Sequence, residues 1–462
     1  MRIAIIGGGA TGVLAALHLA RVLSRDVAEI LIIEPATTLG RGLAYSTEDP
    51  RHLLNVRVAN MSAFADQPEH LFQWLQERGS LGRVKSATPF CFIPRGVYGD
   101  YIGDLAQGLL TSGVIRHIRA RCINLIETEA SVTLKLDLRE NLVCDCAILA
   151  MGNDPKPALS GVPALQPWTK ETLSDLEANA PILIVGTGLT MVDMVLSLDR
   201  NGHRARITAL SHHGLIPSAH RPTQIVALAS TEVPFGSELS QLTGWLRRFA
   251  RAIASGGGDW RSAIDALRPH TQRLWRSMSA VQKRRFLRHA RPYWDVHRHR
   301  MAPEVEEQIS ALRTSGRLDI VAGRIVRAER TGHRVTVKIA RRGGLHVEAA
   351  EYGRLIDCTG LADDPLRSSN PLMRALLMEG NARTDALGIG LDIDEEYALV
   401  NVSSESSKRV RAIGPLARAA FWECIAIPDI RLQCRDLAQK IAANTSAPAR
   451  AGSAPVPRID SN

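Results

Sequence analysis

Two glycine-rich turns constrain this chain of 462 residues more than any other feature. The first lies in MRIAIIGGGATGVLAALHLA, where Gly7-x-Gly9-x-x-Gly12 separates a β-forming run from a helical run. In such a turn the first glycine makes the tight bend, the second admits a pyrophosphate, and the third lets the helix pack on the strand. The helix start, with Ala10 and Thr11, offers unpaired N–H groups to the phosphates. The turn therefore predicts a dinucleotide site.

An acidic residue follows the first turn at the distance expected for ribose binding. The run EILIIEP ends in Glu34, twenty-two residues beyond Gly12. A carboxylate at the end of this second strand accepts hydrogen bonds from ribose hydroxyls. Strand, turn, helix, strand and acid in this order favour nucleotide binding over a merely structural glycine turn.

The second turn lies in ILIVGTGLTMVDMVLSL and departs from the pattern at one position. Gly186 and Gly188 are present, but Met191 stands where the third glycine would be. This substitution permits a nucleotide with looser packing of helix on strand.

The strand after the second turn ends without an acid. In ARITALSHHGLIP the end carries Ser211, followed by His212 and His213, and Arg221 comes soon after. Because no carboxylate opposes a 2′-phosphate there, the sequence favours NADPH over NADH, although NADH remains open. A polar loop without a ligand is the alternative for the histidines.

The segments after the two turns resemble each other. Alternating strands close on Gly152 in one case and on Gly360 in the other. We predict an α/β fold with two Rossmann-like dinucleotide-binding domains, each with a β-meander insertion, and with the first domain discontinuous. The predicted parts are 1–155 and 361–442 for the first domain, 176–360 for the second with a helical insertion at 235–300, and a disordered tail at 443–462.

Charge and hydropathy narrow the class of protein. The net charge is +10, and residues 273–300 hold nine Lys or Arg against the single acid Asp295. A solvated helix face or an anionic small molecule explains this stretch better than nucleic acid, because no nucleic-acid-binding motif accompanies it. No apolar run is long enough to span a bilayer, and the first strand begins at Ile3, so we expect a cytoplasmic protein without a membrane partner.

The seven cysteines predict neither a metal site nor a redox-active disulfide. They form no C-x-x-C pair and no zinc-type spacing. Cys144 and Cys146 are expected on the same face of one strand, in a packing role. We therefore expect no metal.

Each of the two fingerprints is followed by a closing run, AILAMGN after the first and DCTG after the second. This arrangement is similar to that of the flavoproteins with two dinucleotide-binding domains. A narrower match, in GRGLAYSTEDPRHLLNVRVANMSAFADQPEHLFQWL, WDVHRHRM and IGPLARAAFWECIAIPDIRLQ, resembles the FAD/NAD(P)-binding group described as YdhS-like. The resemblance implies FAD on the first unit and NAD(P)H on the second. It also implies that the flavin side is formed by Arg41, Gly42, Tyr45, Asn55, Met61 and Gly414.

The resemblance implies an FAD-dependent NAD(P)H oxidoreductase. A monooxygenase acting through a hydroperoxyflavin on a small nitrogenous or anionic substrate, such as a urate-like compound or an amine, is the leading hypothesis. A dehydrogenase or electron-transfer reductase and a non-enzymatic FAD-binding redox sensor are the alternatives. The partners are then a small molecule and molecular oxygen, and the oligomeric state is left open.

The run RPYWDVHRHRM brings aromatic and cationic groups together. His297 and His299 are candidates for proton transfer because imidazole titrates near neutral pH, and Arg298 is a candidate for gripping an anionic substrate. Two alternatives stay open for this cluster, which are binding of the cofactor phosphates and sealing of a domain interface.

Overall fold

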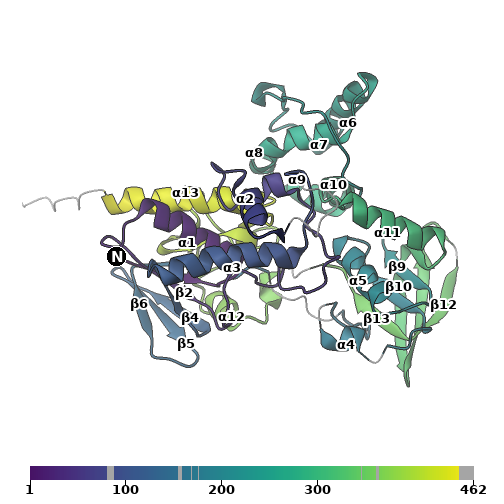
Figure 1. Cartoon of the computed structure of the whole chain (residues 1–462), viewed down its shortest axis with the longest axis horizontal. Coiled ribbons are helices and arrows are strands. Elements are labelled where there is room, and N and C mark those ends of the chain that lie inside the picture. The colour runs from purple at the N-terminus through teal and green to yellow at the C-terminus, as the bar shows by residue number, and fades with distance from the viewer. Residues whose placement is uncertain are drawn as a thin grey trace, which may run out of the picture.

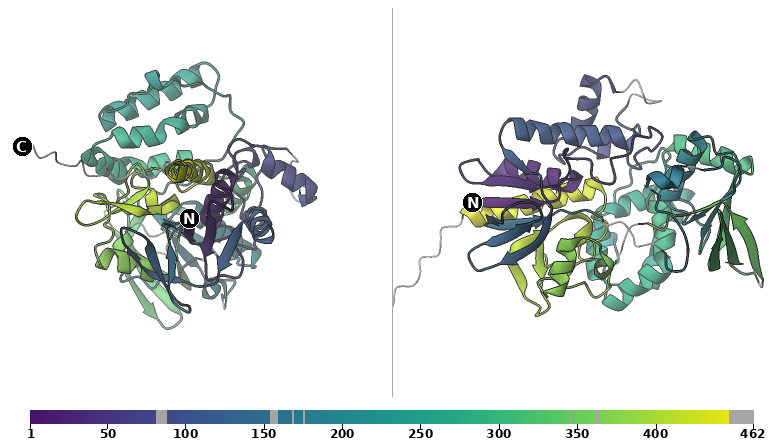
Figure 2. Two further views of the ribbon diagram at one scale, coloured as in Figure 1. Left: turned by 90° about the vertical axis from the view of Figure 1, so that its left-hand side faces the viewer. Right: turned by 90° about the horizontal axis from the view of Figure 1, so that it is seen from below.

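The computed structural model describes residues 1–80, 88–153, 159–167, 169–174, 176–344, 346–360 and 364–446. Two sheets lie side by side along the long axis, and a group of helices stands over their junction (Figures 1 and 2). The predicted boundaries at 155 and 361, and the predicted tail from residue 447 on, fall outside the described residues. The last helix extends to Ser446, so the first four residues of the predicted tail, 443–446, are helical.

The first sheet is a Rossmann-like sheet built from both ends of the chain. Its order is β14-β15-β7-β1-β2-β3, parallel except for β14. The continuous apolar runs of β1, β2 and β7 are buried, as a parallel sheet covered on both faces requires. The strands are β1 (Arg2–Ile6), β2 (Glu29–Ile33), β3 (Ile115–Ile118), β7 (Cys146–Leu149), β14 (Ala398–Val400) and β15 (Ser406–Ala412). The predicted discontinuous domain is confirmed.

Helices cover this sheet and bring the end of the chain to its start. Helix α1 lies between α13 and α3 (Figure 1), and Cys434, Leu437 and Ala438 of α13 are buried in the core that α1 shares. The helices and short turns of this part are α1 (Ala10–Val22), η1 (Val58–Asn60), α2 (His70–Glu77), α3 (Arg95–Thr111), η6 (Pro365–Arg367), α12 (Pro371–Met378), η7 (Gly414–Ala417) and α13 (Ile427–Ser446).

The predicted meander of the first domain forms a sheet of its own. Antiparallel strands β4 (Cys122–Glu127), β5 (Val132–Leu136) and β6 (Leu142–Cys144) pair with one another. The expectation that Cys144 and Cys146 share one face of one strand is wrong, because the chain leaves β6 at Cys144 and enters β7 at Cys146, in another sheet. Both thiols are buried, and burial raises their pKa to about 12 and about 11. Both side chains belong to the core of the first domain, which agrees with the predicted packing role.

The second sheet repeats the plan with a different meander. Its order is β12-β11-β10-β9-β8-β13. The first residues of β10 pair in parallel with β9, and the same strand continues into an antiparallel pair with β11, so this meander is an extension of the sheet. The elements are α4 (Lys170–Leu173), β8 (Ile182–Val185), α5 (Leu189–Arg200), β9 (Ile207–Ser211), α11 (Pro303–Thr314), β10 (Leu318–Thr331), β11 (Arg334–Arg341), β12 (Val347–Tyr352) and β13 (Arg354–Asp357).

The helical insertion lies between β9 and α11, as predicted. Ser279 caps α9 by accepting the N–H of Gln282 at 3.3 Å, and a π-helical turn joins α9 to α10. Its elements are η3 (Ser230–Glu232), α6 (Leu239–Ser255), α7 (Arg261–Leu267), η4 (Arg268–His270), α8 (Thr271–Ser277), α9 (Ala280–Arg285), η5 (Phe286–Ala290) and α10 (Arg291–Arg298). Across the described ranges, no helix has the length and hydropathy needed to cross a bilayer.

Candidate functional site

The first glycine turn is sterically fixed at two of its three positions. Gly7 has φ +109°, and a Cβ there would lie 2.5 Å from the carbonyl oxygen of Ala150. A Cβ on Gly12 would overlap the Gly7 carbonyl. Gly9 caps α1, and its Cβ would only reach ordinary contact with Gly42, 3.4 Å away. Gly7 and Gly12 therefore serve the packing, whereas Gly9 and Gly42 leave open backbone at the start of α1.

Glu34 is held beside this turn. Its carboxylate accepts the N–H of Gly8 at 2.9 Å and the N–H of Ala36 at 3.0 Å. The loop at Gly414 closes over the start of α1, where a Cβ on Gly414 would lie 2.9 Å from the methyl group of Thr11. The predicted residues Ala10, Thr11, Glu34 and Gly414 thus converge on one helix N-terminus. Unpaired N–H groups and a nearby acid there suit a pyrophosphate and a ribose.

The loop predicted to face the flavin lies against both domains. Arg41 forms an ion pair with Asp100, and Tyr45 packs on Tyr98 with ring centroids 4.8 Å apart. The Asn55 carbonyl accepts a hydrogen bond from His220 of the second domain at 3.0 Å. The predicted residue Met61 is 2 % exposed and belongs to the core of the first domain.

Several buried donors near this loop lack a partner. The hydroxyl of Tyr98, Nε of Arg431 and Nε2 of Gln433 are buried and make no hydrogen bond to any described residue. Gln433 Oε1 meanwhile accepts the Gly414 N–H at 2.7 Å, and Arg431 Nη1 donates to Ser62 at 2.7 Å. Buried donors of this kind require an acceptor, and the nitrogen and oxygen atoms of a flavin supply acceptors. The residues present therefore fit FAD. Sequence reasoning did not find Arg431 and Gln433.

The second glycine turn matches the first in geometry. Gly186 has φ +107°, and a Cβ there would overlap the Cys358 carbonyl, as one on Gly7 approaches Ala150. Gly188 begins α5, and a Cβ there would meet nothing within 4 Å. Met191 is fully buried and fills the space that a third glycine would leave empty. Gly152, which closes the first domain, has φ +71° and open space around it.

Ser211 ends β9 beside this turn. Its hydroxyl lies 2.8 Å from that of Thr187 and accepts the Gly214 N–H at 3.0 Å. His213 lies beyond it, and its Nδ1 is 2.8 Å from Nη1 of Arg342, in the turn after β11. Partial burial, with the cations of Arg342 and His212 nearby, lowers the pKa of His213. The strand end therefore carries hydroxyl, imidazole and guanidinium groups and no carboxylate.

Arg221 lies apart from this group. Its carbonyl accepts a hydrogen bond from Arg57 of the first domain at 2.9 Å, and it lines a hollow with Phe90 and His220. Arg342, which sequence reasoning missed, contacts His213 beyond the end of β9, where a guanidinium from Arg221 was expected. No local signal marks Arg342, because the β10–β11 pairing brings it back to β9.

The cluster at the end of α10 seals an interface. The Glu423 carboxylate accepts Nε1 of Trp294 at 2.7 Å and Nε of Arg298 at 2.9 Å. Arg300, which is 2 % exposed, donates to both oxygens of Asp265. Of the three hypotheses for this cluster, the contacts of these residues agree with sealing of the interface between the insertion and the first domain.

The two histidines of the cluster lie in different surroundings. Burial, with Arg298 and other cations nearby, lowers the pKa of His299 to about 3. The premise that His299 titrates near neutral pH is therefore wrong. His297 packs edge-on against Trp260 with ring centroids 4.7 Å apart, and its Nδ1 lies 2.6 Å from the Tyr293 carbonyl.

The cysteines and acids of the described chain form no metal site. All seven cysteines are buried and free. Within the ranges that the structure describes, no group of three or more His, Cys, Asp or Glu residues could hold a metal ion.

Known proteins support this architecture. Residues 4–154 match the family model described as FAD-NAD(P)-binding, so the first unit is an FAD/NAD(P)-binding domain. No curated protein sequence matches the chain. The narrower YdhS-like resemblance stays a prediction.

The fold is similar to solved two-domain flavoproteins. An ornithine N-hydroxylase from Kutzneria sp. 744 aligns over 96% of this chain and 99% of its own, with 16% identity and a TM-score of 0.65. The L-lysine 6-monooxygenase from Pseudomonas syringae aligns over 96% and 99%, with 15% identity and a TM-score of 0.62. Thioredoxin reductase from Lactococcus lactis aligns over 96% and 99%, with 12% identity and a TM-score of 0.53. These likenesses show the fold.

Proposed function

We propose that this protein, with the fold of the two-domain flavoproteins, is an FAD- and NADPH-dependent monooxygenase that hydroxylates a small nitrogenous or anionic substrate. One observation carries the cofactor assignment. The two glycine turns have the same geometry, but an acid follows the first and Ser211 follows the second. A ribose with free hydroxyls suits Glu34, and a ribose with a 2′-phosphate suits the serine, histidine and arginine of the second turn.

Each end of the FAD site has its own residues in this proposal. Backbone N–H groups at Gly9 and Thr11 bind the pyrophosphate, and Glu34 accepts hydrogen bonds from the ribose. Arg431 and Gln433, whose buried donors lack a partner, would hold the flavin ring by donating to its nitrogen and oxygen atoms. When bound, FAD supplies the capacity to accept hydride from NADPH and to pass electrons to oxygen or another acceptor.

The NADPH side uses the second turn. Gly186 and Gly188 open the start of α5 to the pyrophosphate, and His213 with Arg342 binds the 2′-phosphate. His52, in the loop of the first domain, lies 2.9 Å from the hydroxyl of Ser197 on α5. This contact ties α5 to the loop and fixes the distance between the two cofactor sites.

The cysteines argue against a disulfide substrate. A flavin disulfide reductase needs an accessible thiol pair, and thiolates react whereas buried thiols are inert. Burial raises the pKa of Cys358 and of Cys424, and all seven cysteines are buried. Similarity to the ornithine and lysine hydroxylases adds support for hydroxylation over disulfide reduction.

Rapid-mixing absorbance of the FAD-loaded protein tests this proposal. NADPH without oxygen is expected to bleach the visible flavin band, and admission of oxygen is expected to restore it. With substrate present, oxygen consumption should form hydroxylated product in place of hydrogen peroxide. Absence of bleaching with NADPH and NADH, tested with and without candidate substrates, would contradict hydride transfer. Bleaching with peroxide as the sole product for every candidate would favour the reductase hypothesis.

A further inference from the structure

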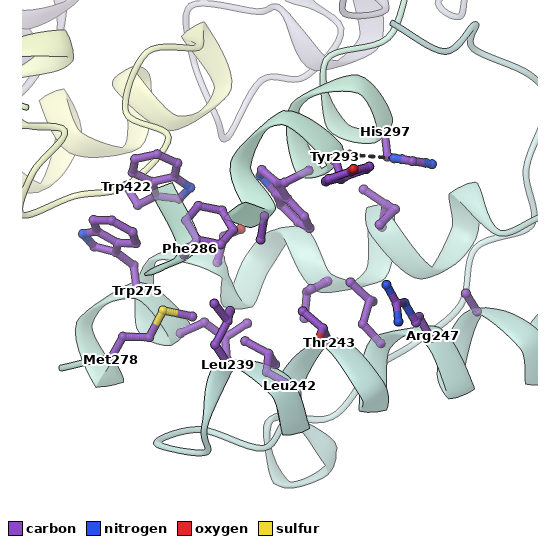
Figure 3. Close-up of a pocket in the computed structure, with 18 of the residues that line it drawn as sticks. Leu239, Leu242, Thr243, Arg247, Trp275, Met278, Phe286, Tyr293, His297 and Trp422 are labelled. Atoms are coloured by element: carbon purple, nitrogen blue, oxygen red, sulfur yellow. Dashed lines mark hydrogen bonds between the residues drawn. The ribbon is translucent and has the colours of Figure 1, made fainter. Parts of the chain in front are cut away.

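A cavity of about 490 Å³ lies inside the helical insertion. Side chains of α6 form one wall, and those of α8, η5 and α10 form the other (Figure 3). The lining is mostly aliphatic and aromatic, and it contains no Asp or Glu. A concave, largely apolar space of this size is typical of small-molecule sites.

The inner end of the cavity is an aromatic wall against the first domain. Trp275 stacks on Trp422 with ring centroids 4.4 Å apart, and Phe286 meets Trp422 edge-on. Trp422 comes from the segment before α13, and it also lines a second hollow with His299 and Glu423. This indole therefore lies at the end of the cavity that faces the first domain, where the FAD ring is proposed.

The outer end of the cavity carries polar side chains, among them one guanidinium. Figure 3 shows Arg247 and His297 at the opposite end from Trp275 and Trp422, and His289 also belongs to the lining. Arg247 makes no hydrogen bond or ion pair with any residue that the structure describes, whereas Arg298 and Arg300 nearby are paired with acids. An unpaired guanidinium beside apolar walls is complementary to a carboxylate.

The α6 wall is incompletely packed by the protein itself. Of its seventeen residues only Leu239 is fully buried, and the apolar residues Leu242 and Leu246 stay half-buried on the cavity side. The opposite wall includes the π-helical turn η5, which places Phe286, His289 and Ala290 along the cavity. Such turns occur frequently at functional sites.

We propose that this cavity binds the substrate, and that the substrate is an amphiphilic carboxylate. Its apolar body lies between α6 and the aromatic wall, its carboxylate pairs with Arg247, and its far end points to Trp422 and the flavin side. The substrate role rests on the proposed function, whereas the binding site does not.

Calorimetric titration of the FAD-loaded protein tests the site with decanoate, decan-1-ol and decylamine, which share one chain length and differ in charge. We expect decanoate to bind and the amine to bind at least about tenfold more weakly. Arg247→Gln should weaken the binding of decanoate about tenfold, because the substitution removes a hydrogen bond from a charged donor. Decan-1-ol should bind this variant and the parent equally. The matched control is Arg248→Gln, at the next residue, which is exposed like Arg247 but lies outside the cavity lining, and it should bind like the parent.

A second variant tests whether the ligand occupies the cavity. Ala250→Phe fills the cavity and should abolish decanoate binding while leaving the melting temperature at or above that of the parent. No decanoate binding to the parent, equal binding of decylamine, or undiminished binding to both variants would overturn the proposal. So would occupation of the cavity by a second copy, seen as a dimer that Ala250→Phe dissociates.

Failure of this proposal is distinguishable from failure of the proposed function. Decanoate binding without NADPH-dependent bleaching would support the site and contradict the monooxygenase. Bleaching of the flavin band without decanoate binding would overturn the proposed binding site and leave the monooxygenase proposal standing. The rate of NADPH oxidation tests whether the bound carboxylate acts as a substrate. Decanoate should accelerate this oxidation in the parent and in Arg248→Gln. At the same concentration it should not accelerate the oxidation in Arg247→Gln.

Discussion

Ser211 occupies, in the second sheet, the position that Glu34 occupies in the first. Ile6 pairs with Ile33 in one sheet and Val185 with Leu210 in the other, and the next residues are Gly7 with Glu34 and Gly186 with Ser211. The turn glycine donates its N–H to the partner strand at 3.0 Å and 2.7 Å respectively. The two turns therefore share one backbone arrangement at the end of the paired strands, and the side chain that follows the second strand differs between them.

Cofactor choice is expected to follow this position. Ser211→Asp places a carboxylate where the 2′-phosphate of NADPH binds, and the two anions repel each other. We expect kcat/KM for NADPH to fall at least about tenfold while that for NADH is kept or rises. Steady-state oxidation of both cofactors measures the ratio. Arg342→Ala is the companion variant, and it should impair NADPH alone. Equal losses for both cofactors would contradict the assignment.

The glycines of the two turns are expected to differ in their tolerance of alanine. A Cβ on Gly12 overlaps the Gly7 carbonyl, whereas one on Gly188 meets nothing. Gly12→Ala should cost about 1–3 kcal/mol of stability and lose FAD. Gly188→Ala should keep its melting temperature and FAD content, and raise KM for NADPH, since the methyl group faces the pyrophosphate. Thermal unfolding and flavin absorbance provide the comparison.

Stability is expected to fall as the pH drops below neutrality. Burial lowers the pKa of His220 to about 4 and that of His299 to about 3. The unfolded chain takes up protons on these imidazoles below pH ~6.5, and the folded chain does not until the pH nears 4 at His220 and 3 at His299. The loss should therefore run from about pH 6.5 to about pH 4 for His220 and to about pH 3 for His299, and reach ~1–2 kcal/mol per histidine, discounted for partial exposure.

Urea unfolding at a series of pH values measures this loss. His220→Gln and His299→Gln should each flatten the slope between pH 6.5 and 4. His333→Gln, at an exposed hairpin turn, is the control and should leave the slope unchanged. A parent protein whose stability is constant over this range would contradict the shifted pKa values.

The contact of Glu423 with the helical insertion is expected to contribute strongly to holding the insertion against the first domain. The side chains of Glu423 and Arg298 are 5% and 10% exposed, so Glu423→Ala leaves a buried guanidinium without its acid. Such a loss costs about 3–5 kcal/mol, whereas Glu329→Ala, in an exposed pair, should cost under about 1 kcal/mol. Urea unfolding measures the loss of unfolding free energy in each of the two variants. Limited proteolysis should also cut the insertion faster in Glu423→Ala, and equal stabilities of the two variants would contradict this role.

Local patterns sufficed to predict the two strand–turn–helix units and the residues at the ends of their second strands. Each turn with its strand and helix is contiguous in sequence, so Gly7, Glu34 and Ser211 could be assigned from spacing. The expectation that Cys144 and Cys146 share one face of one strand failed because the chain passes from one sheet to another at Asp145, and no periodicity reports such a change within three residues.

Other parts of the site depend on contacts between distant segments. Arg342 reaches His213 through a hairpin more than a hundred residues further along the chain, and Arg298 meets Glu423 across two domains. The pKa of His299 depends on burial, which a single sequence does not specify. The cavity beside Arg247 arises from the spacing of α6 and α10, and helical patterns in sequence give no distance between helices.

The position of β15 also orders events during synthesis on the ribosome. The first strand of the chain pairs with β7, but β7 pairs in turn with β15, which is made only at residues 406–412, and α1 is covered by α13 after that. The second sheet is contiguous from β8 to β13 and can close while the N-terminal unit still waits for its last strand. The nascent N-terminal segment therefore stays without its last strand until residues 406–412 have been made, and the proposed FAD site, which includes Gly414, is completed only after that step.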